Sequence, residues 1–271
     1  MKSAGKQQVD ILLPDVEDSV QPLDMKPVAR KCIVEFVAAG SFEGKRIFPR
    51  INGPDSGELL KDLDALVIPG VDGFMYPKAQ GGKDIYFFDQ LLLAFEKERG
   101  FAPGSFKMIP LIETASAVLN AREICEASNR VVAVAYGCED FITDLRGIHD
   151  ANSKSLFVPR AMIAMAARAA RVAPVDTVHI DVKNIPDLRL NLELARNLGF
   201  EGMLSLHPLE IEHIHEFFSP SPAELQKAQD IIAKYEQGEK NGLGVVLIDN
   251  ELIGPPMYKD ALNIVARGRK T

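Results

Sequence analysis

The chain has 271 residues, of which 46% are hydrophobic and 25% charged, and its formal net charge is −7. The length is close to the roughly 250 residues of a (β/α) barrel, and the apolar content suffices for one sizeable core. An acidic chain lacks the basic face that a phosphate backbone selects, so we expect no nucleic-acid partner. No stretch reaches the ~18 apolar residues of a membrane span, nor does the start look like a secretory signal, and we expect a cytoplasmic protein without membrane contact.

Seven short apolar runs of β-forming residues follow one another along the chain, and each ends at a polar or charged side chain. The runs cover 9–13, 46–49, 74–77, 107–112, 131–136, 177–180 and 202–206. Segments with helical apolar spacing lie between them, such as 84–99 and 186–198. This alternation predicts parallel βαβ units that close into a (β/α) barrel of the TIM type, whose active site lies at the carboxyl ends of the strands.

The side chains at these strand ends are the candidate site residues. In chain order they are Asp15, Glu17 and Asp18, then Arg50, Lys78, Glu113, Glu139 and Asp140, Asp181, and His207. Two acids at neighbouring strand ends, Glu113 and Asp140, indicate a metal site. The guanidinium of Arg50 suits carboxylates and oxyanions, or it forms an ion pair with Glu17 or Asp18, and both can hold at once.

The three cysteines, Cys32, Cys125 and Cys138, are widely spaced and form no C-x-x-C pair. We therefore expect neither disulfides nor structural zinc. Cys138 is near the candidate site, but no strand-end histidine is clearly paired with it. We interpret it as a small buried residue and not as a nucleophile.

The C-terminal part has the pattern of an arm outside the barrel. A helix is predicted over 222–237, followed by a turn at 242–244 and a break at Pro255 and Pro256. We therefore divide the chain into a barrel domain, residues 1–218, and an arm, residues 219–271. The apolar side chains of Leu252, Ile253 and Met257 would need a cover, and a partner subunit is one way to provide it.

Six motifs at the strand ends resemble, in order and spacing, those of the citrate lyase beta-subunit-like group of the HpcH/HpaI aldolase superfamily. They are DVEDSV at 15–20, PRIN at 49–52, YPK at 76–78, IETA at 112–115, GCED at 137–140 and LHP at 206–208. The resemblance runs from about residue 9 to residue 266. It implies a metal-dependent carbon–carbon lyase acting on citryl-, malyl- or citramalyl-CoA.

The resemblance also implies roles for residues. Glu113 and Asp140 would hold Mg²⁺, for which Mn²⁺ can substitute, and Arg50 would bind the substrate beside the metal. We expect Arg50 and Glu17 to be catalytic, and Arg50, Glu113, Asp18 and Lys78 to contact the substrate. Glu17 and Asp18 would mainly orient Arg50 and metal-bound water. Relatives of this group assemble as trimers or multiples of trimers, so a homo-oligomer is expected.

The chain departs from the family pattern at two places. Relatives begin with an additional strand and a turn with aromatic and basic residues, and we expect the barrel here to lack that first strand. At the C terminus, Gly254 stands where relatives carry an aspartate that acts in proton transfer. Two alternatives to thioester cleavage therefore stay open: an aldolase on a small hydroxy-keto acid without CoA, and a non-catalytic metal- and acid-binding relative.

Overall fold

The computed structural model describes residues 3–149 and 154–268 of the chain. It divides into two compact units, Met1–Ile211 and Glu212–Thr271, which are described separately below. The division lies within helix α9 (Pro208–Phe218), whereas the sequence placed the end of the barrel domain at residue 218.

The first unit is built on parallel strands that follow one another in chain order. They are β1 (Ile11–Leu12), β2 (Arg46–Ile47), β3 (Gly73–Tyr76), β4 (Lys107–Ile112), β5 (Ala133–Tyr136), β6 (Ala173–Asp176) and β7 (Gly202–Met203). β1 pairs with β2, and β3 to β7 form one five-stranded sheet. Arg50 joins the two sheets, because its backbone bridges Asp15 on one side and Met75 on the other.

Residues within or directly after each of the seven strands contribute to one apolar core. Phe48, Met75, Ile109, Leu111, Ala133 and Ala135 are buried in it, and Ile11, Leu13, Val132, Ala173, Val175 and Leu204 pack against them. Side chains from the first and the last strand therefore meet the same cluster, as they do inside a barrel. The parallel α/β architecture is as the sequence predicts. That a first strand of the family is lacking stays a prediction.

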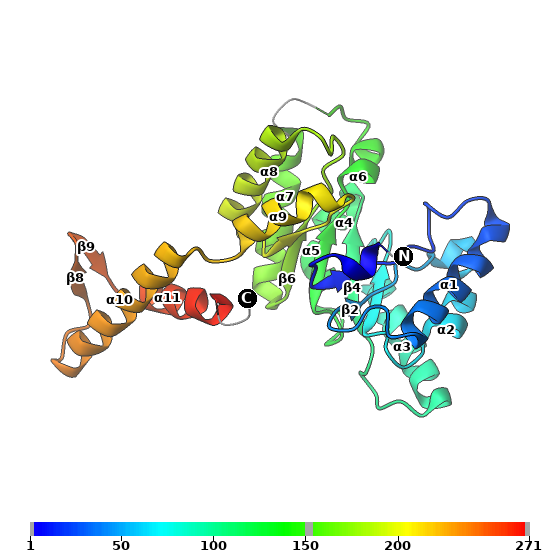
Figure 1. Ribbon diagram of the computed structural model, residues 1–271, viewed down its shortest axis with the longest axis horizontal. Coiled ribbons are helices and arrows are strands. Elements are labelled where there is room, and N and C mark those ends of the chain that lie inside the picture. The colour runs from blue at the N-terminus through cyan, green and yellow to red at the C-terminus, as the bar shows by residue number, and fades with distance from the viewer. Residues whose placement is uncertain (1–2, 150–153, 269–271) are drawn as a thin grey trace. The chain divides into compact units, whose positions relative to one another are not determined.

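Helices follow the strands of the first unit (Figure 1), and the last of them, α9, continues into the second unit. They are α1 (Lys26–Ala38), α2 (Leu59–Leu66), α3 (Gly82–Arg99), α4 (Ala115–Leu119), α5 (Ala121–Glu126), α6 (Cys138–Leu145), α7 (Phe157–Ala170), α8 (Ile185–Leu198) and α9. Short 3-10 turns are η1 (Ala4–Lys6), η2 (Leu23–Met25), η3 (Pro54–Ser56) and η4 (Lys154–Leu156). The helices expected over 84–99 and 186–198 are thus confirmed as α3 and α8.

The sixth strand was predicted wrongly. The apolar run at 177–180 suggested a strand ending at Asp181, but β6 is Ala173–Asp176 and pairs with β5 through Ala133 and Ala173. Proline lacks the N–H that a central strand donates, so Pro174 argued against a strand here. Its carbonyl still accepts a hydrogen bond from the Glu201 backbone at 2.9 Å. The residues at this strand end are therefore Asp176 and Thr177.

The second unit contains the C-terminal part of α9, followed by α10, a hairpin and α11 (Figure 1). α10 (Pro222–Lys240) begins with a capping box, in which Ser221 and Glu224 satisfy each other's backbone N–H groups. β8 (Val246–Ile248) and β9 (Glu251–Ile253) are antiparallel, and α11 (Pro255–Gly268) follows. Tyr235 stacks on Tyr258 with ring centroids 4.7 Å apart, which joins α10 to α11.

Apolar side chains of the hairpin divide between the inside and the outside of this unit. Ile253 is only 2% exposed and packs with Tyr235 and Ile248, so the expectation that it needs a partner's cover was wrong. Leu252 and Met257 are 67% and 47% exposed, as expected, and Leu247 is 66% exposed. Across the two described ranges, no helix is both long enough and apolar enough to span a membrane.

Candidate active site at the carboxyl ends of the strands

Arg50 lies at the end of β2 and is fixed by its neighbours on both sides. Its backbone N–H donates to the Pro14 carbonyl at 2.9 Å. Its side chain grips Asp15 with two hydrogen bonds, from Nε to Oδ1 at 2.8 Å and from Nη2 to Oδ2 at 2.5 Å. The third nitrogen, Nη1, lies 3.2 Å from Oε2 of Glu17. Two parallel bonds hold the guanidinium plane in one orientation, so Arg50 is preorganised.

Asp15, and not Asp18, is the acid that orients Arg50. Asp18 pairs instead with Lys78, whose Nζ lies 2.7 Å from Asp18 Oδ2 and 2.8 Å from Glu17 Oε1. The expectation that Glu17 and Asp18 mainly orient Arg50 was therefore wrong for Asp18, whereas Glu17 forms an ion pair with Arg50. Glu17 lies between the two cations, and it is 4% exposed.

A buried lysine, Lys26, fixes the loop that carries these acids. Nζ of Lys26, at the start of α1, donates to the carbonyl oxygens of Val16 and Glu17 at 3.0 and 3.1 Å, and to Asn52 Oδ1 at 2.6 Å. Asn52 Nδ2 in turn donates to Val16 O and to Asp62 Oδ2. Each donor of the ammonium group has a partner, so the lysine is satisfied inside the protein. Its evident role is to fix the loop that carries Glu17.

Glu113 follows β4 and is a buried carboxyl, 2% exposed. Its Oε2 accepts the backbone N–H of Lys78 at 2.8 Å. Burial raises the pKa of Glu113 to about 8, and the negative charges of Asp140 and Glu17 act in the same direction. The Lys78 N–H and the charge of Arg50 oppose this rise without cancelling it. Asp140 thus acts electrostatically on Glu113, as expected for two acids that follow the adjacent strands β4 and β5.

Asp140 is exposed and lies in the first turn of α6. Gly137 lies in the turn that leads from β5 to α6, and its N–H donates to the Ile112 carbonyl at 2.8 Å. A Cβ on Gly137 would lie 2.6 Å from Glu113 Cγ. Glycine is therefore needed for the close approach of the β5–α6 turn to Glu113.

The donor set fits a hard divalent cation. Negative charge exceeds positive charge among the acids Asp15, Glu17, Asp18, Glu113 and Asp140 and the bases Arg50 and Lys78. Oε2 of Glu17 is buried and accepts no hydrogen bond, because the nearby Arg50 nitrogen is not aligned with it. In the described parts of the chain, no three His, Cys, Asp or Glu side chains gather as a metal cage. Glu113 and Asp140 would thus provide the small protein share that Mg²⁺ usually takes.

Two other candidates are structural in the described geometry. Cys138 is 3% exposed, and burial raises the pKa of its thiol to about 12, so a thiolate nucleophile is disfavoured there. His207 is exposed, and its Nδ1 accepts the Leu209 N–H at 3.2 Å, which caps its own turn.

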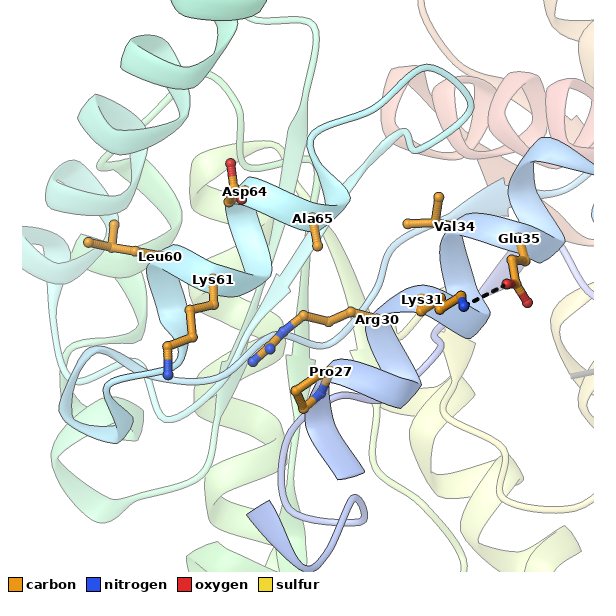
Figure 2. Close-up of a pocket in the computed structure, with 9 residues that line it drawn as sticks. All are labelled: Pro27, Arg30, Lys31, Val34, Glu35, Leu60, Lys61, Asp64 and Ala65. Atoms are coloured by element: carbon orange, nitrogen blue, oxygen red, sulfur yellow. Dashed lines mark ion pairs between the residues drawn. The ribbon is translucent and has the colours of Figure 1, made fainter. Parts of the chain in front are cut away.

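A groove of about 740 Å³ between α1 and α2 is separate from this cluster of acids (Figure 2). It is lined by Pro27, Arg30, Lys31, Val34, Glu35, Leu60, Lys61, Asp64 and Ala65. Arg30, the cation at its base, is already paired with Glu58 and with Asp62, the latter at 2.7 Å. The two carboxylates that line the groove are also paired, Glu35 with Lys31 at 3.8 Å and Asp64 with Arg99 at 2.7 Å, so we do not place the active site there.

Sequence reasoning gave Asp15 no role of its own, and it did not identify Lys26 or Asn52 as side chains that support the site. Asp15 did carry a signal, because it directly follows the first strand and opens the first motif. Lys26 carried none, since a lysine at the start of an amphipathic helix is ordinarily solvated. Its role depends on contacts with residues up to 26 positions away.

Comparison with known proteins decides the family. The model of the HpcH/HpaI aldolase/citrate lyase family matches residues 1–208. The chain belongs to this family. Over 265 residues it is 30% identical to the citrate lyase subunit beta of Leuconostoc mesenteroides subsp. cremoris, covering 98% of this chain and 87% of the relative. It is 28% identical to the mitochondrial citramalyl-CoA lyase of Rattus norvegicus, covering 95% and 79%.

A solved structure of this fold is that of the CitE protein of Mycobacterium tuberculosis in complex with magnesium, acetoacetate and coenzyme A. The TM-score is 0.77 at 24% identity, over 98% of this chain and 91% of the other. The TIM-barrel fold of HpcH/HpaI proteins is thereby supported. The chain is therefore an enzyme of the citrate lyase beta-like group of lyases. Membership of this group does not favour the alternative of a non-catalytic metal- and acid-binding relative.

Proposed function

We propose that this enzyme is a Mg²⁺-dependent carbon–carbon lyase that cleaves a 3-hydroxyacyl thioester of the citryl-, malyl- or citramalyl-CoA type. The observation that supports the proposal is that buried Glu113 after β4 lies under the electrostatic influence of both Asp140 after β5 and the doubly held guanidinium of Arg50 after β2. The names of the relatives, which include citrate lyase subunit beta and citramalyl-CoA lyase, support the substrate class.

Glu113 and Asp140 would hold the metal, which could be Mg²⁺ or Mn²⁺. When bound, it supplies a Lewis acid that lowers the pKa of the substrate hydroxyl. Glu17 Oε2 has a free acceptor position and takes the hydroxyl proton. The oxygen then forms a carbonyl, the adjacent carbon–carbon bond breaks, and its electron pair passes to the thioester fragment as an enolate. Returning the proton to the enolate carbon balances the reaction.

Arg50 stabilises the negative charge that develops during bond cleavage. Because Asp15 fixes the guanidinium plane, the arginine needs little reorientation when that charge appears. Lys78 places a second positive charge beside Glu17. It contacts the carboxylate end of the substrate, and Asp18 holds the lysine in place.

A second candidate is an aldolase on a small hydroxy-keto acid without CoA. Gly254 favours it, because a glycine cannot transfer the proton that relatives' aspartate transfers at this position. Thermal shift with Mg²⁺ and a panel of ligands separates the two. Stabilisation by CoA esters, with cleavage of malyl- or citramalyl-CoA, supports the thioester lyase. Stabilisation by glyoxylate, pyruvate or oxaloacetate alone supports the aldolase.

Assembly as a homo-oligomer, a trimer or a multiple of it, is part of the proposal. Exposed Leu247, Leu252 and Met257 on the second unit support it, because apolar side chains gathered on one small unit favour burial against a partner.

A further inference from the structure

Helix α6, which carries Asp140, has no N-cap side chain of its own. Its N-cap residue is Gly137, which makes no side-chain cap hydrogen bond. Serine, threonine, aspartate or asparagine would be usual there, because their oxygen accepts one of the free N–H groups of the first turn. None of them fits, because a Cβ on Gly137 would lie 2.6 Å from Cγ and 2.8 Å from Oε1 of Glu113. The position of Glu113 therefore denies α6 an ordinary cap.

Thr177 supplies an acceptor from the neighbouring strand. Its Oγ1 accepts the backbone N–H of Cys138, the first residue of α6, at 3.0 Å. Thr177 is 1% exposed and directly follows β6, so water does not compete for this bond. The two residues are 39 positions apart in the chain. A side chain on β6 thus replaces the cap that Gly137 cannot provide.

The threonine is itself held in place by buried groups. Its neighbour in the chain, Asp176, is fully buried. Asp176 Oδ1 accepts from Arg160 Nε at 2.9 Å, and Arg160 Nη1 donates to Asn191 Oδ1 at 3.1 Å. This chain of contacts fixes the end of β6 against α7 and α8. Thr177 is therefore held rigidly, so its hydroxyl can fix the position of the first residue of α6.

We propose that Thr177 is a positioning residue that sets the place of Asp140 relative to Glu113, and this rests on the proposed role of those two acids in metal binding. Asp140 lies in the same first turn as the N–H that Thr177 accepts. Holding Cys138 fixes where the first turn begins and which way it faces. Without this bond, the exposed carboxylate of Asp140 loses its defined distance to the buried carboxylate of Glu113.

The test is Mg²⁺ affinity, measured by calorimetry on the full chain. Thr177→Val keeps the shape and removes the acceptor, and we expect it to weaken Mg²⁺ binding about tenfold or more, as loss of a residue that supports a metal ligand commonly does. Thr177→Ser keeps the hydroxyl and is expected to stay within about twofold of the unmodified protein. Equal loss in the serine and valine variants would overturn the proposal, because the methyl group and not the hydroxyl would then matter.

Thr143→Val is the matched control on the same helix. Its hydroxyl donates to the Glu139 carbonyl at 3.0 Å, but the side chain is exposed and does not touch Cys138. We expect it to leave Mg²⁺ affinity unchanged, because it removes a hydroxyl from α6 without touching the hydrogen bond that holds Cys138. If Thr177→Val only lowers the melting temperature and binds Mg²⁺ normally, Thr177 has no positioning role.

The same experiment separates this inference from the proposed function. Loss of Mg²⁺ binding in Glu113→Ala together with normal binding in Thr177→Val refutes the inference alone. Absence of Mg²⁺ binding in the unmodified protein refutes the metal site, and with it both proposals.

Discussion

At the residue scale, the site depends on how Arg50 divides its donors. Nε and Nη2 donate hydrogen bonds to the Asp15 carboxylate, and Nη1 faces Glu17. Burial alone would favour the neutral guanidine, but Asp15 and Glu17 outweigh it and raise the pKa of Arg50 well above its usual range. The side chain is still 23% exposed. A permanently charged, oriented guanidinium is thus presented at the strand ends.

Arg50→Lys tests whether orientation or charge alone matters. A lysine keeps the positive charge but cannot span both oxygens of Asp15 and also face Glu17. We expect kcat/KM for the cleaved substrate to fall by about 10²- to 10³-fold, the usual cost of losing one oriented donor. Steady-state kinetics measures this, with Arg99→Lys as the control because Arg99 pairs with Asp64 away from the site. An unchanged kcat/KM would mean that Arg50 is structural.

The sequence predicted some of these residues and not others, for physical reasons. Glu113 and Arg50 were found because each directly follows an apolar run, and a strand end is where a barrel places its site. Asp15 was a candidate without an assigned role, because three acids follow the first run and the sequence does not show which of them faces Arg50. Thr177 could not be found, since its partner is 39 positions away and the sixth strand was itself misplaced.

At the element scale, strand prediction worked where burial leaves an uninterrupted apolar run, as in β4 and β5. It failed at β6, where Pro174 lies inside the strand and a more apolar run follows it. Pairing with β5 overrode the local preference, because a strand between two others is stabilised by ladders on both sides.

At the opposite end of the strands, a buried pair joins α3 to the start of β5. Glu96, which is 0% exposed, accepts hydrogen bonds from Arg130 Nη1 and Nη2 at 2.6 and 2.7 Å. It also accepts the N–H groups of Gly104 and Phe106. Burial would raise the pKa of Glu96, but these donors outweigh burial and lower it.

Glu96→Gln is therefore expected to destabilise the protein in a pH-dependent way. A carboxyl with a lowered folded-state pKa stabilises the fold above its unfolded-state pKa of about 4.3, and this contribution is lost as pH falls through the folded value. We expect the variant to lose about 3 kcal/mol of unfolding free energy at pH 7, because Arg130 loses its main partner.

Urea denaturation at several pH values measures this difference. The difference in unfolding free energy between the two proteins should become smaller only below about pH 4. There the unmodified protein begins to lose the stabilisation that the Glu96 charge provides. Glu98→Gln, on the exposed side of the same helix, is the control and should change little at any pH. A destabilisation that does not depend on pH down to the acid range would contradict the role of the Glu96 charge.

At the scale of the whole molecule, the exposed apolar side chains of the second unit predict self-association. We expect sedimentation velocity at micromolar concentration to show a trimer or a multiple of it. Leu247→Glu combined with Leu252→Glu should shift the protein toward monomer, because each places a charge on a surface that association would bury. Leu23→Glu, at a similarly exposed leucine of the first unit, is the control. A monomer in the unmodified protein would contradict this expectation.

The central claim is that Glu113 and Asp140 form a Mg²⁺ site beside Arg50. Titration calorimetry of the metal-free protein with Mg²⁺, compared with Glu113→Gln, tests it most directly. Glutamine keeps the size of the side chain and removes the charge that a hard cation prefers. The account predicts saturable Mg²⁺ binding in the unmodified protein and at least about a 100-fold loss of affinity in the variant. Equal affinity in the two proteins, or no binding in either, would contradict it.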